Sequence, residues 1–290
     1  MTETLTAADL EPCFALLDEA YDTHKPTHVF TLLSGGHDST TATTIGQEWA
    51  TRRGIHVPVA YANTGTGIEA RHVVGTGLKD TRSHVLDLCQ MHEWSLIELH
   101  PPRSYESLVR EMGFPGPGFH DRLAYPRLKE RSFRTLRRMA AEKACVMFVT
   151  GVREEESVRR TAHVERIQVT PGVIWAAPIW DWTKLDCNAF IAERGLPRNQ
   201  ISDAIHISGE CLCGAMARKD EREALRQWLP IKMDEIEALE DDAEALGIRA
   251  CRWGQRPPKV AREQMRAFLT PHDGSYPMAC MGCAPDEDSA

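Results

Sequence analysis

The run Ser34-Gly35-Gly36-His37-Asp38-Ser39-Thr40 limits more than any other feature what this chain can fold into. It follows the apolar, β-prone residues 29–33 and precedes residues 39–53, whose apolar side chains recur at helical spacing. A strand, a small-residue loop and a helix together direct backbone N–H groups and a helix N-terminus at one point, where an anion binds. Two adjacent glycines let the chain turn sharply and approach a ligand closely. The loop therefore predicts a phosphate site, and an ordinary Gly-Gly turn with an Asp or Ser helix cap is the alternative.

Strand-like and helix-like segments alternate along the chain. The expected strands are 28–33, 57–62, 95–99 and 146–150. The expected helices are 5–22, 39–53, 68–91 and 125–143. This alternation predicts an α/β fold with a doubly wound, mostly parallel sheet. Ligands of such sheets bind beyond the carboxyl ends of the strands, so residues 34–40, 63–65 and 151–153 are expected to meet in one crevice.

The character of the chain changes near residue 202, where two cysteine pairs begin to bracket a charged, helical stretch at 218–246. We therefore expect two domains, a nucleotide-binding domain at 1–201 and a helical, cysteine-containing C-terminal region at 202–290. Residues 113–121 are rich in glycine and proline and predict a loop, which is either a mobile lid over the crevice or a surface connection.

The formal net charge is −8, from 34 basic and 42 acidic residues. This balance argues against broad nonspecific binding of nucleic acid, but it permits a local basic groove. Such a groove is one interpretation of the expected helix at 125–143, and a solvated charged face is the other. Its six basic residues are Arg127, Lys129, Arg131, Arg134, Arg137 and Arg138. No membrane-spanning run or secretory signal is recognisable, so a cytoplasmic protein is expected.

Nine cysteines occur in the chain, and four of them form a C-x-C and a C-x-x-C pair. These four are Cys211, Cys213, Cys280 and Cys283. Four thiolates from two short loops suit either tetrahedral zinc or a [4Fe–4S] cluster, and Cys251 is a candidate replacement for one ligand. Four unligated, buried cysteines are the alternative. Cys13, Cys89, Cys145 and Cys187 lie in apolar segments and are expected in the core.

The Ser-Gly-Gly-x-Asp-Ser pattern at 34–39 resembles the PP-loop of the adenine-nucleotide α-hydrolase superfamily. Residues 151–160 resemble the Gly-Ile/Val-Arg-x-x-Glu-Ser-x-x-Arg motif of its phosphoadenylyl-sulfate (PAPS) reductase-like branch. Residues 178–183 and 196–199 resemble the Pro-Ile-x-x-Trp-Thr and Gly-Leu-Pro-x-Asn segments of that branch. The matches fall in family order between residues 28 and 201, and together they are far more specific than one loop.

The resemblance implies a HUP, Rossmann-like PP-loop fold and an adenine-nucleotide site. The nucleotide-binding residues that it implies are Ser34, Gly35, Gly36, His37, Asp38, Ser39, Thr40, Asn63, Thr64, Gly65, Gly151 and Arg153. The catalytic residues that it implies are Asp38, Arg153 and Arg160. The chain departs from the branch at His37, where lysine or a small residue is common, and at Asn63, where aspartate is common. The first cysteine pair is also Cys-x-Cys here, whereas the reductases have adjacent cysteines.

The first functional hypothesis is an ATP-dependent enzyme that cleaves ATP between its α and β phosphates with Mg²⁺, releases pyrophosphate and adenylylates an acceptor. The family resemblance favours a [4Fe–4S] cluster over zinc at the four cysteines. It also favours sulfur transfer or nucleic-acid modification as the process in which ATP cleavage takes part. The partners expected on this hypothesis are a nucleic acid or a sulfur carrier fed by a cysteine desulfurase-type donor, and a second copy of the chain in a homodimer.

The second hypothesis is thiol-dependent reduction of PAPS or adenylyl sulfate to sulfite. Reductases attack sulfur with a cysteine in a C-terminal Glu-Cys-Gly-x-His tail, which this sequence lacks after Cys283. The third hypothesis, from another class, is a noncatalytic nucleotide-binding subunit of a larger complex.

Overall fold

The computed structural model describes residues 10–116, 124–140, 144–155, 165–207, 209–215, 217, 220–248, 252–256, 258–259 and 263. The strands are β1 His28–Leu32, β2 Val59–Ala62, β3 Leu96–Leu99, β4 Val146–Val149, β5 Ile167–Thr170 and β6 Val173–Ala176. The first helices are α1 Glu11–His24, α2 His37–Arg53, α3 Thr81–Met91, α4 Tyr105–Met112 and α5 Arg131–Ala140. The later helices are α7 Lys184–Glu193, α8 Gln200–Ile205, α9 Glu221–Trp228 and α10 Pro230–Ala245. Two short helical turns are η2 Ala70–Val73, which is 3₁₀, and η4 Pro126–Glu130, which is π-helical.

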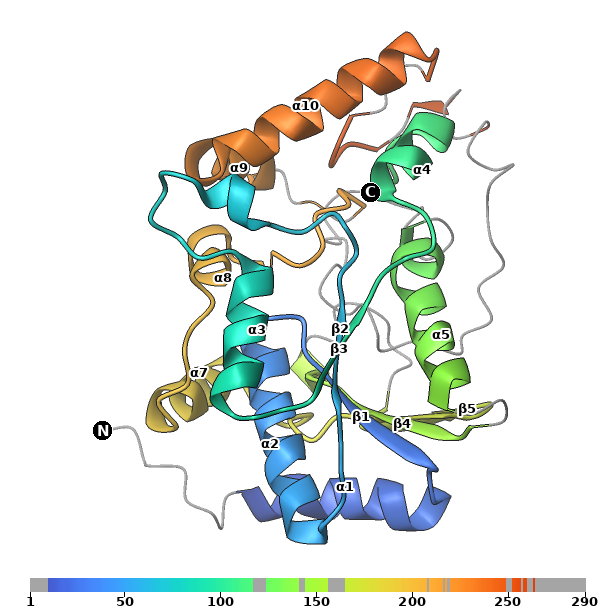
Figure 1. Ribbon diagram of the computed structural model, residues 1–290, viewed down its shortest axis with the longest axis vertical. Helices are drawn as coiled ribbons and strands as arrows, with labels where there is room; N and C mark the ends of the chain where they lie inside the picture. Colours follow the sequence, from blue (N-terminus) through green and yellow to red (C-terminus); the bar gives the residue numbers. More distant parts are fainter. Residues whose placement is uncertain are drawn as a thin grey trace.

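A six-stranded sheet in the order β3-β2-β1-β4-β6-β5 forms the centre of the molecule (Figure 1). All neighbouring strands are parallel except the edge pair β5–β6, which is antiparallel. Strand β1 lies between β2 and β4, so the loops that follow these three strands leave the same edge side by side. The prediction of an α/β fold with a doubly wound, mostly parallel sheet is confirmed.

Each face of the sheet has its own apolar layer, because alternate side chains of a strand point to opposite faces. Val29 of β1 packs in one cluster with side chains of α1, α2, α3 and α7. Its neighbour Phe30 packs in the other cluster with Phe133 and Leu136 of α5. Helices therefore cover both faces, as a doubly wound sheet requires.

A separate apolar cluster lies under α4, α8, α9 and α10. Figure 1 shows α4, α9 and α10 grouped at one end of the molecule, with α1 at the opposite end. The cluster draws side chains from both sides of residue 201, among them Tyr105 and Val109 of α4 and Leu225 and Met233 of α9 and α10. The C-terminal helices thus share a core with α4. Within the described part of the chain, no helix combines the length and the apolar character needed to cross a membrane.

The expected helix at 68–91 is wrong in its first half. Helix α3 begins only at Thr81, where the side chain of Asp80 accepts a hydrogen bond from the Ser83 N–H. Before it, Gly75 and Gly77 adopt positive φ angles of 78° and 73°, which end any continuous helix. The chain therefore crosses from β2 to α3 through the short turn η2 and an irregular segment.

Other expectations need smaller changes. The expected helix at 125–143 is divided into the π-helical turn η4 and helix α5 in the described range. Strands β5 and β6 and helices α7 and α8 were not among the expected elements. The expected loop at 113–121 is described only as far as residue 116, and the rest lies outside the described residues.

Candidate functional site

Three loops meet at the carboxyl edge of the sheet, as the sequence predicts. They follow β1, β2 and β4, and they contain residues 33–36, 63–65 and 150–153. Helix α2 begins directly after the first of these loops and ends at Arg53, with Gly54 as its C-cap residue at φ 66°. The crevice of an open α/β sheet lies at such an edge. We take this edge as the candidate site.

Gly35 shapes the loop after β1. Its φ of 80° favours glycine, and a Cβ atom at this position would lie 2.8 Å from Cγ2 of Thr81. The side-chain amide of Asn199, which is fully buried, donates a 2.9 Å hydrogen bond to the Gly35 carbonyl oxygen. The Asn199 carbonyl group also caps α8 by accepting from the N–H groups of Ile201 and Ser202. Asn199 is therefore a loop-holding residue that the sequence places only in a family motif.

Ser34 and Ser39 bind each other across the loop. The Ser39 hydroxyl oxygen lies 3.0 Å from the Ser34 hydroxyl and 3.1 Å from the Ser34 N–H, and it donates to the Gly36 carbonyl oxygen at 2.9 Å. Gly36, the N-cap residue of α2, provides no side-chain cap. Helices α3, α4, α7 and α8 each have a side chain as N-cap, whereas α1, α9 and α10 have none, like α2. The start of α2 thus keeps uncapped N–H groups, which is the arrangement that binds anions.

Asp38, in the first turn of α2, is held by two cations from distant parts of the chain. Nε of Arg153 lies 3.1 Å from Oδ2, and Nζ of Lys184 lies 2.9 Å from Oδ1. Burial alone would raise the pKa of Asp38, but the charges of Lys184 and Arg153 outweigh it and hold that pKa below its usual value. Asp38 is therefore a carboxylate at neutral pH, and each of its oxygens accepts from a cation.

Gly151 lies against the start of α2. A Cβ atom at Gly151 would lie 2.6 Å from the carbonyl carbon and oxygen of Asp38 and 2.7 Å from the Ser39 nitrogen. The family resemblance implies that this glycine binds the nucleotide. In the structure its close approach is to the backbone of α2, so Gly151 sets where the helix begins.

His37 is buried, with its side chain turned toward α8. Its Nε2 lies 3.3 Å from Oδ1 of Asp203 but makes no hydrogen bond in the described structure. Burial, Arg198 and Lys184 lower the pKa of His37, so it is neutral at pH 7. We therefore assign His37 to the wall between the loop and α8. Thr40, also predicted to bind nucleotide, is 2% exposed.

The loop after β2 is bound to other parts of the chain. The amide of Asn63 donates to Oε1 of Glu98 at 2.8 Å, and its carbonyl group accepts from the N–H of Gly65. Thr64 is fully buried, and its hydroxyl donates to the Glu210 carbonyl oxygen at 3.0 Å. Gly65 has a φ of 74° with open space around it. Of these three predicted residues, Gly65 and the partly exposed Asn63 present the accessible surface.

The cysteine segment lies directly behind that loop. The N–H of Leu212 donates to the Thr66 hydroxyl at 2.8 Å, and the hydroxyl of Tyr105 donates to the Cys213 carbonyl oxygen at 2.6 Å. Cys213 is buried and Cys211 is half-buried. Within the described residues, no group of three or more side chains forms a metal site. Cys280, Cys283, Cys251 and Arg160 lie outside the described residues.

At least three of the six basic residues of the expected helix at 125–143 bind other groups of the protein. Lys129 forms a buried ion pair with Glu210 at 2.7 Å, and Arg134 bonds to Glu130. Arg137 donates to the carbonyl oxygens of Ala144 and Pro171. These contacts account for three of the six charges without nucleic acid.

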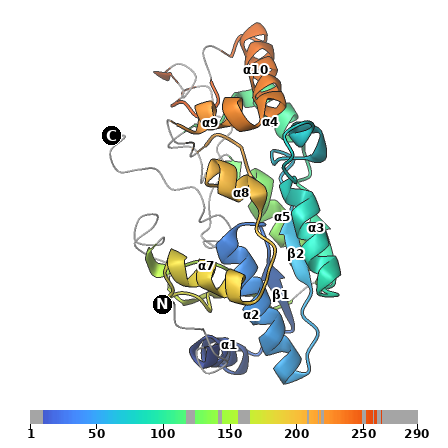
Figure 2. The ribbon, with the colours of Figure 1, turned by 90° about the vertical axis from the view of Figure 1, so that its left-hand side faces the viewer.

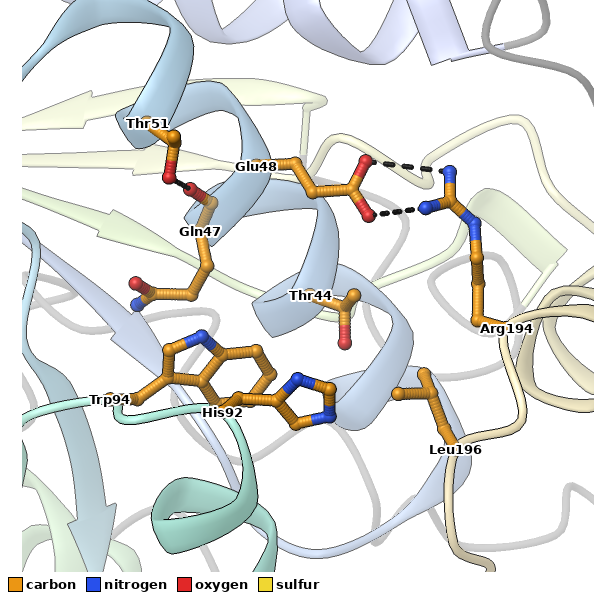
Figure 3. A pocket seen from close by; sticks show the side chains of 8 residues that line it. All are labelled: Thr44, Gln47, Glu48, Thr51, His92, Trp94, Arg194 and Leu196. Atoms are coloured by element: carbon orange, nitrogen blue, oxygen red, sulfur yellow. Dashed lines mark hydrogen bonds and ion pairs between the residues drawn. The ribbon is translucent and has the colours of Figure 1, made fainter.

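A cavity of about 310 Å³ lies away from this edge, along the outer side of α2 (Figure 3). Its lining residues are Thr44, Gln47, Glu48, Thr51, His92, Trp94, Arg194 and Leu196. Arg194 and Glu48 face each other there, with Nη1 of Arg194 2.8 Å from Oε1 of Glu48. The cavity thus has a polar rim fixed by an ion pair, and none of the residues of the 34–40 loop lines it.

No protein-family model and no curated protein matches the chain. Among solved structures, the chain is similar to the PAPS reductase of Candida auris in a phosphate complex. The identity is 15%, 70% of this chain and 94% of that chain are covered, and the TM-score is 0.43. The chain is also similar to the FMN adenylyltransferase of Candida glabrata with FMN and an ATP analogue. The identity is 9%, 97% of this chain and 92% of that chain are covered, and the TM-score is 0.49. It is also similar to the U34-tRNA thiolase of Methanococcus maripaludis with its [4Fe–4S] cluster. The identity is 12%, 89% of this chain and 77% of that chain are covered, and the TM-score is 0.42. At these identities we build the proposed function from the side chains of the crevice.

Proposed function

We propose that this chain binds an adenine nucleotide at the carboxyl edge of the sheet and cleaves ATP between the α and β phosphates. The observation that carries the proposal is the uncapped start of α2 beside the Asp38–Arg153–Lys184 ion cluster. The N–H groups of the loop and of the first turn would hold phosphate oxygens. The nearby cations would stabilise negative charge that develops on the leaving pyrophosphate while an acceptor attacks the α phosphorus.

The acidic residue of the loop, Asp38, is the natural candidate for holding the Mg²⁺ of such a reaction. Both of its oxygens accept hydrogen bonds from cations. The side chains therefore do not fit a protein-held Mg²⁺ at Asp38, and we derive no step through such an ion. We assign Asp38 instead to orienting Arg153 and Lys184.

We retain Cys211, Cys213, Cys280 and Cys283 as proposed ligands of a [4Fe–4S] cluster or zinc. The described pair fits this role in chemistry, since two thiols lie two residues apart in one short, hydrogen-bonded loop. A bound cluster would supply or activate sulfur for an adenylylated acceptor, such as a nucleic acid or a sulfur carrier. The visible absorption spectrum of anaerobically purified protein tests the cluster, and a spectrum without visible bands would exclude it.

Reduction of PAPS is the second candidate function. The state of Cys187, the cysteine near the 34–40 loop, argues against it. The thiol of Cys187 is buried near Asp38, and burial together with that carboxylate raises its pKa. A buried, protonated thiol is a poor nucleophile for sulfate sulfur.

One assay separates the candidates. The protein is incubated with ATP and Mg²⁺, with and without candidate acceptors, and separately with PAPS and reduced thioredoxin. We expect pyrophosphate from ATP and no sulfite from PAPS. Sulfite alone would contradict the proposal in favour of the reductase, and nucleotide binding without either product would favour a noncatalytic subunit.

A further inference from the structure

Two helix N-termini converge on Asp38. Lys184 is the first residue of α7, and its ammonium group binds Asp38 in the first turn of α2. Near the other ends of the same helices, Arg194 binds Glu48. Helices α2 and α7 therefore pack against each other start to start and end to end, and Figure 2 shows them as neighbours.

A lysine in the first turn is unfavourable for α7 itself. The N-terminus of a helix carries partial positive charge, so it favours acidic side chains and disfavours basic ones. Helix α7 has an acidic residue in this turn, Asp186, which forms a capping box with Thr183. Lys184 therefore does not stabilise α7 through the helix dipole. Its ion pair with Asp38 offsets the unfavourable position and directs its charge toward the loop.

Arg153 and Lys184 differ in how accessible their side chains are to a ligand. Arg153 is 5% exposed in its side chain, and it donates from Nε to Asp38 and from Nη1 to Glu155. The Lys184 side chain is 48% exposed. An ammonium group has three N–H donors, and in the described part of the chain one of them binds Asp38. The accessible cation of the cluster is thus Lys184, whereas Arg153 is built into its wall.

We propose that Lys184 is a ligand-contacting residue that donates to the phosphate or sulfate oxygens of the nucleotide bound at the 34–40 loop. Asp38 holds the ammonium group in place before the ligand arrives. The inference rests on the proposed function, because it places the anionic part of an adenine nucleotide in the crevice. It assigns a contact to a residue outside the motifs that identified the loop.

The experiment measures binding by titration calorimetry in excess EDTA, with ATP, PAPS and adenosine as probes. The variants are Lys184→Gln, Lys184→Met and Lys184→Arg, with Arg194→Gln as matched control. Arg194 also joins α7 to α2 through one carboxylate, but it lies at the far end of the helices. Loss of one charge-assisted hydrogen bond is expected to weaken ATP binding about tenfold in Lys184→Gln and Lys184→Met. The same variants should show a weaker salt dependence of ATP affinity, because one phosphate contact is gone.

Further outcomes separate ligand contact from a structural role. Adenosine affinity should be unchanged in every variant, Lys184→Arg should recover most of the ATP affinity, and Arg194→Gln should bind ATP like the wild type. Wild-type ATP and PAPS affinities in both Lys184→Gln and Lys184→Met would overturn the inference alone, as would an equal loss for adenosine. If the wild type binds PAPS and not ATP, and Lys184→Gln weakens PAPS binding, the ATP proposal fails and the inference holds. If the wild type binds neither probe, both fail.

Discussion

The two ends of the α2–α7 helix pair carry the same kind of bond in different surroundings. At the end where both helices begin, Lys184 binds Asp38, whose side chain is 14% exposed and is also held by Arg153. At the other end, Arg194 binds Glu48, and both side chains are about one-third exposed, at 34% and 33%. Figure 3 shows the second pair at the rim of a cavity.

The difference lies in what each cation does for its helix. A cation at the C-terminus of a helix interacts favourably with the carbonyl groups there, so Arg194 stabilises α7 as well as the pair. Lys184 has no such benefit at the N-terminus. On the proposed function, the Lys184–Asp38 pair at the helix starts serves the crevice, whereas the Arg194–Glu48 pair joins the other ends of the two helices.

The largest expected effect comes from two glycines next to α2, Gly151, which packs against its start, and Gly54, which follows its end. Gly151→Ala places a methyl group within 2.6 Å of the Asp38 backbone, and the helix start has to move. We expect a loss of about 3 kcal/mol in the free energy of unfolding, together with loss of ATP binding. Gly54→Ala meets nothing within 4 Å and strains only the φ of 66°, which costs about 1 kcal/mol. Urea unfolding and calorimetry measure both, and ATP binding lost equally in the two variants would contradict the assignment of Gly151.

The second effect compares the two carboxylates. Asp38→Ala removes the anion between two cations in a largely buried cluster, and we expect it to cost about 2–3 kcal/mol of unfolding free energy. Glu48→Ala removes a more exposed partner and should cost at most about 1 kcal/mol. Equal losses in urea unfolding of the two variants would show that burial does not distinguish the pairs.

The third effect uses pH to destabilise the crevice end. Burial lowers the pKa of His84 on α3 to about 4, and its Nε2 has no hydrogen-bond partner in the described structure. The unfolded chain has an ordinary histidine pKa near 6.5, so it binds more protons than the folded chain between pH 6.5 and 4. Stability is therefore fully present above about pH 6.5 and is lost as the pH falls toward 4, by roughly 1–3 kcal/mol for this group.

Urea unfolding of the wild type and of His84→Gln across this pH range tests the assignment. The pH slope should be smaller in His84→Gln and unchanged in Arg194→Gln, because Arg194 lies at the other end of the helices. An unchanged slope in His84→Gln would mean that other groups cause the acid sensitivity.

Local sequence predicted which three loops meet at the carboxyl edge of the sheet, because the signals of those loops are local. Two glycines after an apolar strand predict a turn. The ends of β2 and β4 are recognisable in the same way, because Gly65 and Gly151 follow apolar runs. The failed helix at 68–91 had its own visible signal, since Gly75 and Gly77 stand inside it and Asp80 is a good N-cap.

The partners of the site could not be read from spacing. Lys184 meets Asp38 across 146 residues, and Asn199 meets Gly35 across 164. These contacts depend on how α7 and α8 pack against α2, and hydrophobic periodicity contains no record of that packing. The sequence likewise identified Gly151 as special but could not say that its close neighbour is the Asp38 backbone.

Asn199 has one more consequence. Its side chain uses both kinds of hydrogen-bonding group at once, since the amide nitrogen donates to the Gly35 carbonyl oxygen while the amide oxygen caps α8. An aspartate has almost the same shape and could cap the helix, but in its ionised form it would place a second acceptor against the Gly35 carbonyl oxygen. Deamidation at this position, a change of one atom, would therefore set repulsion where attraction now holds the loop closed.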